Sequence, residues 1–117
     1  MSRIAILYCK RIQDESCIAC AKCHKGMAEK AGEFGRHDTI DLVAMTHCGD
    51  CPGLTVPRVK LLKEMTAGLG RDFDVVHLGT CMKIAMETGN CPIDFEALKA
   101  VLEQKWGLTV VLGTHPY

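Results

Sequence analysis

Eight cysteines and five histidines are the residues of this sequence whose chemistry stands out. Thiolates and imidazoles bind zinc, and thiolates also hold iron–sulfur clusters. Eight cysteines in 117 residues is about 7%, several times ordinary usage but below the roughly 8 to 10% of a disulfide-stapled scaffold. A metal or redox site explains this excess better than the packing of single cysteines does.

The sharpest motif is a Cys-x-x-Cys step at Cys48 and Cys51, followed by Pro52 and Gly53. Two cysteines three apart at a strand-to-helix turn can bind one ion, because Gly49 lets the turn fold so that both sulfurs converge. The same spacing suits a redox dithiol in which Cys48 is the nucleophile and Cys51 resolves the mixed disulfide. Metal binding and thiol–disulfide or sulfur-transfer chemistry both remain open for this motif.

A second group consists of Cys17, Cys20 and Cys23. On a loop, this C-x2-C-x2-C spacing wraps three corners of a four-iron cluster. On a helix, the three positions turn around the axis by about 100° per residue and do not all face one ion. We therefore expect Cys17 and Cys23 to lie at the site, and we leave Cys20 open between ligation and packing.

Four short apolar runs are predicted to be strands, and they alternate with helical patterns. The strands are expected at residues 4–8, 39–45, 73–78 and 108–112, and the helices at 16–30, 55–69 and 94–106. Asp94 and Gly107 are suited to begin and end the last helix, and residues 79–92 have room for a short helix or a functional loop. This order predicts one α/β domain over residues 1–117: a small, open, mostly parallel four-stranded sheet with helices on its faces, layered as in flavodoxin-like or Rossmann-like folds.

The chemistry-bearing residues follow the carboxyl ends of these strands. Ligands of open parallel sheets bind beyond that edge, and a Cys or His residue follows every strand. We therefore expect a Cys/His metal cluster there, and its candidate ligands are Cys9, Cys17, Cys23, Cys48, Cys51, Cys81, Cys91 and His115.

The other histidines have different expected roles. His47 precedes Cys48 and can tune its thiolate by charge. His77 lies inside the third predicted strand, where a hydrogen-bonded core histidine is a better interpretation than a ligand. His24 and His37 are expected to face solvent.

Composition excludes several classes of function. A formal net charge of zero and 5% aromatic residues argue against a nucleic-acid platform. No segment approaches the roughly 18 to 20 apolar residues that cross a bilayer, so we expect no membrane insertion. The first ten residues lack the features of a signal peptide, which predicts a cytoplasmic protein whose thiols stay reduced.

Taken together, these motifs resemble those of the CGGC-domain family, a group of presumed metal-binding proteins found mainly in anaerobic prokaryotes. The resemblance spans nearly the whole chain, although Asp50 stands where the family name has glycine and Cys20 is additional to the family's pattern. The matching segments are the strand ending in Cys9, the Cys17 and Cys23 pair, and residues 46–53, 56–60, 77–81, 91–92 and 113–115. The resemblance implies metal binding, often supposed to be zinc, with no settled activity.

Three interpretations follow for the cysteines. The first is a bound zinc ion or an iron–sulfur cluster, with a role in redox chemistry, electron transfer or sensing and a redox protein as partner. The candidate ligands outnumber the four that one zinc ion takes, which suggests two metal sites or a cluster. The second is a dithiol enzyme that uses Cys48 and Cys51. The third is an α/β domain whose cysteines only pack.

Overall fold

The structure is a computed structural model that describes residues 2–8, 21–48, 55–88 and 93–114, and its centre is a four-stranded parallel sheet. The strands are β1 (Ser2–Tyr8), β2 (Ile40–His47), β3 (Val75–Leu78) and β4 (Thr109–Leu112). They lie in the order β2-β1-β3-β4, and every neighbouring pair is parallel. This arrangement confirms the predicted open parallel sheet, and its order is that of flavodoxin-like folds.

Helices connect the strands, as the sequence predicts. They are α1 (Ala21–Glu29), the 3-10 helix η2 (Gly32–Arg36), α2 (Thr55–Gly68), α3 (Thr80–Glu87) and α4 (Phe95–Trp106). Asp94 caps α4 by accepting hydrogen bonds from the backbone N–H groups of Glu96 and Ala97, and Gly107 ends it with a φ of 64°. The helix α3 lies in the stretch that was expected to hold a short helix or a loop, whereas η2 was not predicted.

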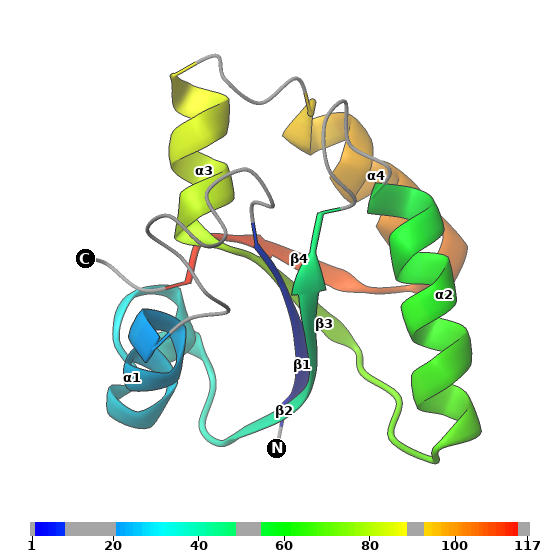
Figure 1. Ribbon diagram of the computed structural model, residues 1–117, viewed down its shortest axis with the longest axis horizontal. Coiled ribbons are helices and arrows are strands. Elements are labelled where there is room, and N and C mark those ends of the chain that lie inside the picture. Colours follow the sequence, from blue (N-terminus) through cyan, green and yellow to red (C-terminus); the bar gives the residue numbers. More distant parts are fainter. Residues whose placement is uncertain (1, 9–20, 49–54, 89–92, 115–117) are drawn as a thin grey trace.

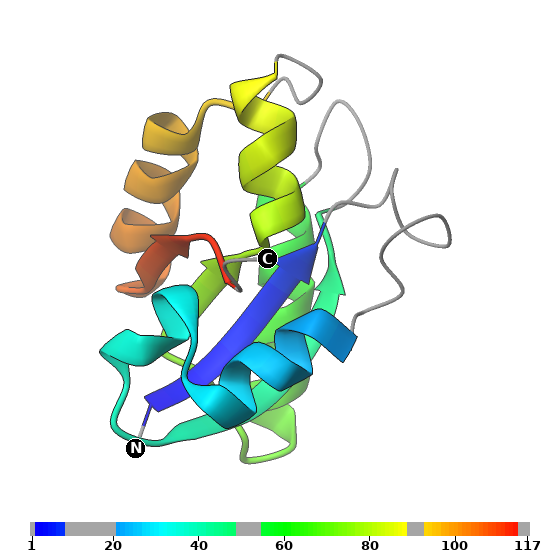
Figure 2. The same ribbon diagram turned by 90° about the vertical axis from the view of Figure 1, so that its left-hand side faces the viewer.

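The helices cover both faces of the sheet. Figure 1 shows α1 on one side and α2 with α4 on the other, while α3 rises from the carboxyl edge of the strands; the turned view in Figure 2 agrees. Side chains of β1 alternate between two apolar clusters: Ile4 and Ile6 face α1 and η2, and Ala5 and Leu7 face α2 and α4. All four are fully buried, as expected for the central strand of a sheet covered on both faces.

A β-bulge interrupts the pairing of β1 with β2. Ile4 pairs with Leu42 but the next residue, Ala5, pairs with Ala44, so Val43 is an extra residue on β2. Hydrophobic side chains of β2 therefore pack on the α1 side at Ile40, Leu42 and Met45, and on the α2 side at Val43 and Ala44. The bulge reverses the alternation of β2, so that every later residue of the strand faces the side opposite to the one a regular strand would give it.

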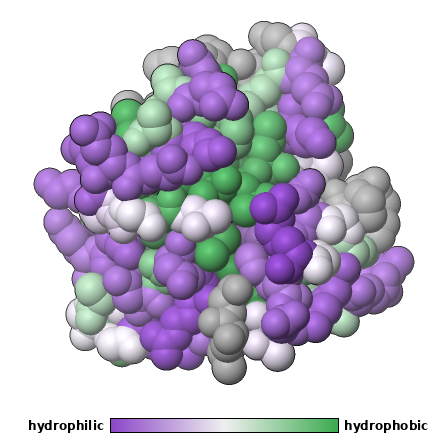
Figure 3. Space-filling view, turned by 180° about the vertical axis from the view of Figure 1, so that it is seen from behind, coloured by the Kyte–Doolittle hydropathy of each residue, from purple (hydrophilic) through white to green (hydrophobic). Residues whose placement is uncertain are grey.

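The face of the molecule opposite to that of Figure 1 is mainly hydrophilic. Seen from behind, purple side chains surround a smaller green hydrophobic area near the centre of the face (Figure 3). None of the helices within the described ranges has the length and apolar character needed to cross a membrane.

Candidate functional site

Three of the predicted site cysteines lie within the described residues, and all three are at the carboxyl edge of the sheet. Cys23 lies in the first turn of α1, Cys48 directly follows β2, and Cys81 is the second residue of α3. Cys23 and Cys48 are buried, and Cys81 is partly buried. The fold therefore gathers cysteines from three separate elements at the edge where the sequence predicts a site.

The other candidates lie outside the described residues. These are Cys9, Cys17, Cys51, Cys91 and His115, together with Cys20, whose role was left open. Among the residues that the structure does describe, no three His, Cys, Asp or Glu side chains are grouped so that they could hold a metal ion. A metal site at this edge would therefore need ligands from the remaining candidates.

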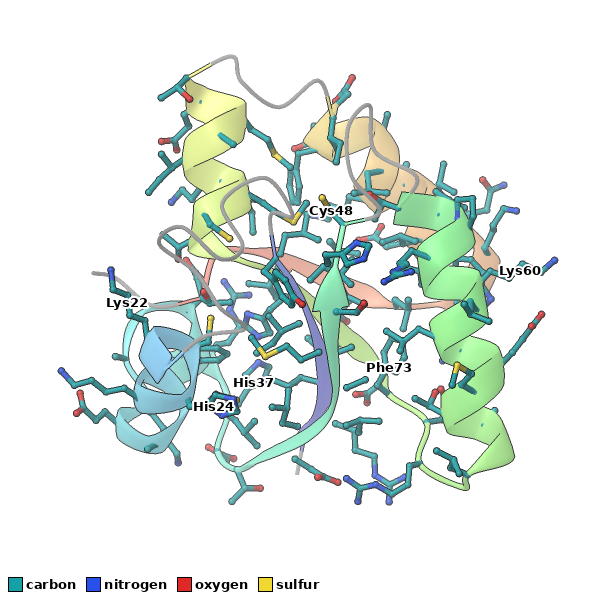
Figure 4. The ribbon with its side chains drawn as sticks, viewed as in Figure 1. Lys22, His24, His37, Cys48, Lys60 and Phe73 are labelled. Atoms are coloured by element: carbon teal, nitrogen blue, oxygen red, sulfur yellow. The ribbon has the colours of Figure 1, made fainter. Side chains whose placement is uncertain are left out.

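The three described cysteines differ in the face of the sheet that they contact. Cys23 belongs to the apolar cluster under α1 and η2, and Cys48 belongs to the cluster under α2 and α4. Cys81 packs against both clusters. Cys48 lies on the α2 side because of the bulge in β2, since a regular strand would turn it toward α1 together with Leu42. Figure 4 shows Cys48 at the carboxyl end of β2, close to the start of α2.

The sulfur of Cys81 lies at the junction of β1 and β3. A Cβ atom added to Gly79 would lie 3.0 Å from Cys81 Sγ and 3.2 Å from the carbonyl oxygen of Leu7. The Gly79 N–H group donates a hydrogen bond of 2.7 Å to that same oxygen. In the sheet, β2 lies on one side of β1, whereas β3 and β4 lie on its other side. The strand order therefore reverses between β1 and β3, and open α/β sheets bind ligands at such a switch point.

The backbone of Cys48 is held on both sides. Its N–H group donates to the carbonyl oxygen of Tyr8 at 2.9 Å, and its own carbonyl oxygen accepts from the Thr55 hydroxyl at 2.8 Å. The first bond continues the pairing of β2 with β1, and the second joins the cysteine to the start of α2. Only 5% of Cys48 is exposed.

Cys23 contacts Thr114, which is one of two hydrogen-bonded threonines that sequence reasoning missed. Its Sγ lies 3.6 Å from Oγ1 of Thr114, which is itself fully buried. Thr114 Oγ1 accepts from the Thr80 N–H group at 3.2 Å, and Thr80 Oγ1 accepts from the Thr114 N–H group at 3.0 Å. These reciprocal bonds join the end of β4 to the start of α3. The signal in the sequence is a Gly-Thr pair after each of the last two strands, at Gly79 and at Gly113.

His47 is paired with Arg58. A guanidinium Nη2 of Arg58 lies 2.6 Å from His47 Nε2, and because a guanidinium can only donate, this nitrogen accepts and carries no proton. The positive charge in this pair therefore belongs to Arg58, which does not support the expected tuning of Cys48 by a charge on His47.

His77 is a hydrogen-bonded core histidine, as expected. It is fully buried, and its Nδ1–H group donates to the carbonyl oxygen of Gly113 at 3.0 Å. Its Nε2 then accepts from Nε2–H of His37 at 2.9 Å. Burial lowers the pKa of His77 to about 4, against the opposing effect of the bond to Gly113. Its ring also packs on that of Phe34, with ring centroids 5.0 Å apart.

The expectation for His37 was wrong, whereas that for His24 is confirmed. His24 is exposed on α1, whereas His37 lies between α1 and the sheet (Figure 4). His37 is buried, and its Nε2 lies 2.9 Å from that of His77. The reason is η2: with about three residues per turn, this helix brings Phe34 and His37 to the same side, toward the sheet. Burial is also the main cause that lowers the pKa of His37.

Comparison with known proteins gives one family and one curated relative. The family model of the CGGC domain matches residues 3–115. An uncharacterized protein of Methanocaldococcus jannaschii is 35% identical over an alignment of 118 positions, which covers 97% of this chain and 86% of that relative. No solved structure matches the chain. The match over nearly the full length confirms the resemblance that the motifs indicated: the chain belongs to the CGGC domain family.

Proposed function

We propose that the protein binds a transition metal through cysteine thiolates at the carboxyl edge of its sheet. The observation that carries this proposal is the position of Cys23, Cys48 and Cys81, which come from three elements far apart in the sequence and lie at one edge. Membership of the CGGC family supports it, since the resemblance implies metal binding. Cysteines that served only as small core residues would have no reason to favour one edge.

The chemistry of the described residues fits a thiolate-bound metal. Cys23 and Cys48 are almost completely shielded from water. The hydroxyl of Thr114 lies beside Cys23 Sγ, and such contacts to a ligand sulfur orient it and adjust its basicity. The ligands are drawn from the predicted set, namely Cys9, Cys17, Cys23, Cys48, Cys51, Cys81, Cys91 and His115.

The number of candidate ligands bears on which metal is bound. One zinc ion takes four ligands, and a closed set of thiolates would make it structural. Seven cysteines and one histidine exceed that number, which favours either two zinc ions or an iron–sulfur cluster held by four thiolates. A cluster would supply one-electron chemistry, and the protein would then act in electron transfer or sensing with a redox protein as partner.

A dithiol enzyme that uses Cys48 and Cys51 is the alternative. A nucleophilic thiol needs access to its substrate, and reactive cysteines are partly exposed. Cys48 is 5% exposed and has its backbone held by Tyr8 and Thr55. This burial favours the metal site. The alternative predicts that Cys51→Ser traps a mixed disulfide at Cys48 when the metal-free protein meets a disulfide substrate.

Elemental analysis tests the proposal. Protein purified without oxygen should contain zinc or iron at close to one or more atoms per chain, and acid-labile sulfide should accompany iron. Cys48→Ala and Cys81→Ala should each lose most of the metal, because each removes a ligand.

His24→Ala is the matched control, since it removes an exposed potential ligand from the same chain and should leave the metal content unchanged. Neither zinc nor iron near stoichiometric amounts, both in the isolated protein and after anaerobic reconstitution, would contradict the proposal.

A further inference from the structure

Gly79 leaves a space that other atoms fill. A Cβ atom at this position would lie 3.0 Å from Cys81 Sγ, 3.2 Å from the Leu7 carbonyl oxygen and 3.6 Å from Tyr8 Cα. The cysteine sulfur and the last two residues of β1 thus border the same space at Gly79. Figure 1 shows α3 rising from the end of β3 next to β1, and the space at Gly79 lies between these elements.

The backbone does not require a glycine here. Gly79 has φ −55° and ψ 152°, a conformation that any residue adopts. It is also the N-cap of α3, a position at which Ser, Thr, Asp or Asn would stabilise the helix by bonding its first N–H groups. Gly79 makes no such bond, and the Thr114 hydroxyl accepts from the Thr80 N–H group instead. What glycine provides at this position is the absence of a side chain.

The atoms around this space differ in how easily they can move. Two of them are backbone atoms of β1, the central strand, which is paired on both sides. The third is a sulfur at the end of a side chain that can turn about one bond. A side chain at position 79 would therefore displace the Cys81 sulfur before it displaced the strand.

We infer that Gly79 is the positioning residue for the Cys81 thiol. Because Gly79 has no side chain, the Cys81 sulfur has room to lie at the carboxyl end of β1, at the switch point of the sheet. This inference deepens the proposed function, because it names the residue that aims one of the metal ligands. Cys81 is the described cysteine that contacts the apolar clusters of both faces, so its direction matters to ligands from either side.

The test compares Gly79→Ala with Gly68→Ala. Gly68 lies in the last turn of α2 and has nothing within 4 Å of an added Cβ atom, so it controls for the glycine-to-alanine change itself. Alkylation of Cys81 by iodoacetamide in metal-free protein, followed by peptide mass spectrometry, reports where the sulfur lies. Gly79→Ala should raise the rate several-fold by turning the sulfur away from β1, and Gly68→Ala should not.

Metal affinity gives a second measurement. Cobalt(II) titration, followed by the thiolate-to-cobalt charge-transfer absorption, should show affinity weakened by about 10- to 100-fold in Gly79→Ala, the range found when a residue that orients a ligand is changed. In the Cys81→Ala background, Gly79→Ala should cause no further weakening. An equal loss in both backgrounds would overturn the inference, because Gly79 would then act without Cys81.

Two further outcomes are decisive. If wild-type protein binds no metal, the proposed function fails, but the alkylation rates still test the role of Gly79. An alkylation rate of Cys81 that is the same in Gly79→Ala as in the wild type overturns that role.

If Gly79→Ala is too unstable to purify, the double variant with Cys81→Ala should fold, since the sulfur is gone. A double variant that is equally unstable would show that the β1 backbone sets the contact, and this too would overturn the inference.

Discussion

At the scale of single residues, the described histidines differ in their hydrogen-bond partners. His77 donates to Gly113 and accepts from His37, so both ring nitrogens are satisfied while the ring is neutral. Protonation of both rings would place two N–H groups against each other at 2.9 Å in a buried site. The pair therefore cannot hold a proton on every ring nitrogen without losing the hydrogen bond between the two rings.

This pair makes the stability of the fold depend on pH. The folded pKa of His77 is about 4, whereas its ordinary value is 6.5, so below pH 6.5 the unfolded chain binds a proton that the native protein does not. The free energy of unfolding should fall as the pH drops from 6.5 to 4, by about 3 kcal/mol for this group. Urea unfolding at a series of pH values measures the slope.

His77→Gln keeps a donor for Gly113 but does not titrate, so its slope in this range should be shallower than that of the wild type. His24→Gln changes an exposed histidine and should leave the slope unaltered. Equal slopes for wild type and His77→Gln would show that the buried pair is not responsible.

At the scale of elements, the ends of helices follow local signals, but the alternation of β2 does not. Asp94 and Gly107 lie at the ends of α4, where the sequence predicts them, because a cap acts within a few residues of itself. The bulge at Val43 depends on how β2 pairs with β1. It decides that Cys48 contacts the α2 side, so a feature of one strand pair determines the surroundings of a candidate ligand.

The cap of α4 gives a direct measure of local stability. Asp94→Ala removes the side chain that accepts from Glu96 and Ala97, and it should lower the free energy of unfolding by about 1 kcal/mol. Asp94→Asn keeps an acceptor oxygen and should stay close to wild type. Chemical denaturation compares the two, and equal losses would mean that charge rather than the hydrogen bond carries the effect.

At the scale of the whole molecule, the carboxyl edge is where the two apolar clusters meet. Cys23 belongs to one cluster, Cys48 to the other, and Cys81 touches both. A metal held by thiolates from this edge would connect α1, β2 and α3. Binding there should therefore stabilise the entire domain rather than one segment.

Removal of the metal should lower the melting temperature. A ligand whose free concentration is 1,000 times its dissociation constant adds about 4 kcal/mol to the free energy of unfolding. For a domain of this size, this corresponds to a rise in melting temperature of at least about 10 °C. Thermal unfolding followed by circular dichroism, with and without a chelator, measures the shift. Cys81→Ala should melt at the same temperature in both conditions, and a wild-type protein that contains metal yet melts unchanged would place that metal outside the folded core.

The sequence by itself determined the order of most strands and helices along the chain, the parallel pairing and the edge at which the three described cysteines lie. These follow from signals that act over short distances: apolar runs, caps, and connections long enough to require parallel strands. It also carried the family motifs, which the match over residues 3–115 confirms. The site in its predicted extent, with Cys9, Cys51 and the other candidates outside the described residues, stays a prediction.

Only the tertiary structure decided which face each described cysteine contacts, which atoms border Gly79, and that His37 is buried against His77. Each of these depends on atoms that are distant in the sequence: Leu7 beside Gly79, and η2 against β3. A residue's type and spacing indicate what chemistry it can do. Its neighbours across the sheet decide where the reacting atom lies, because packing, not sequence order, brings those neighbours together.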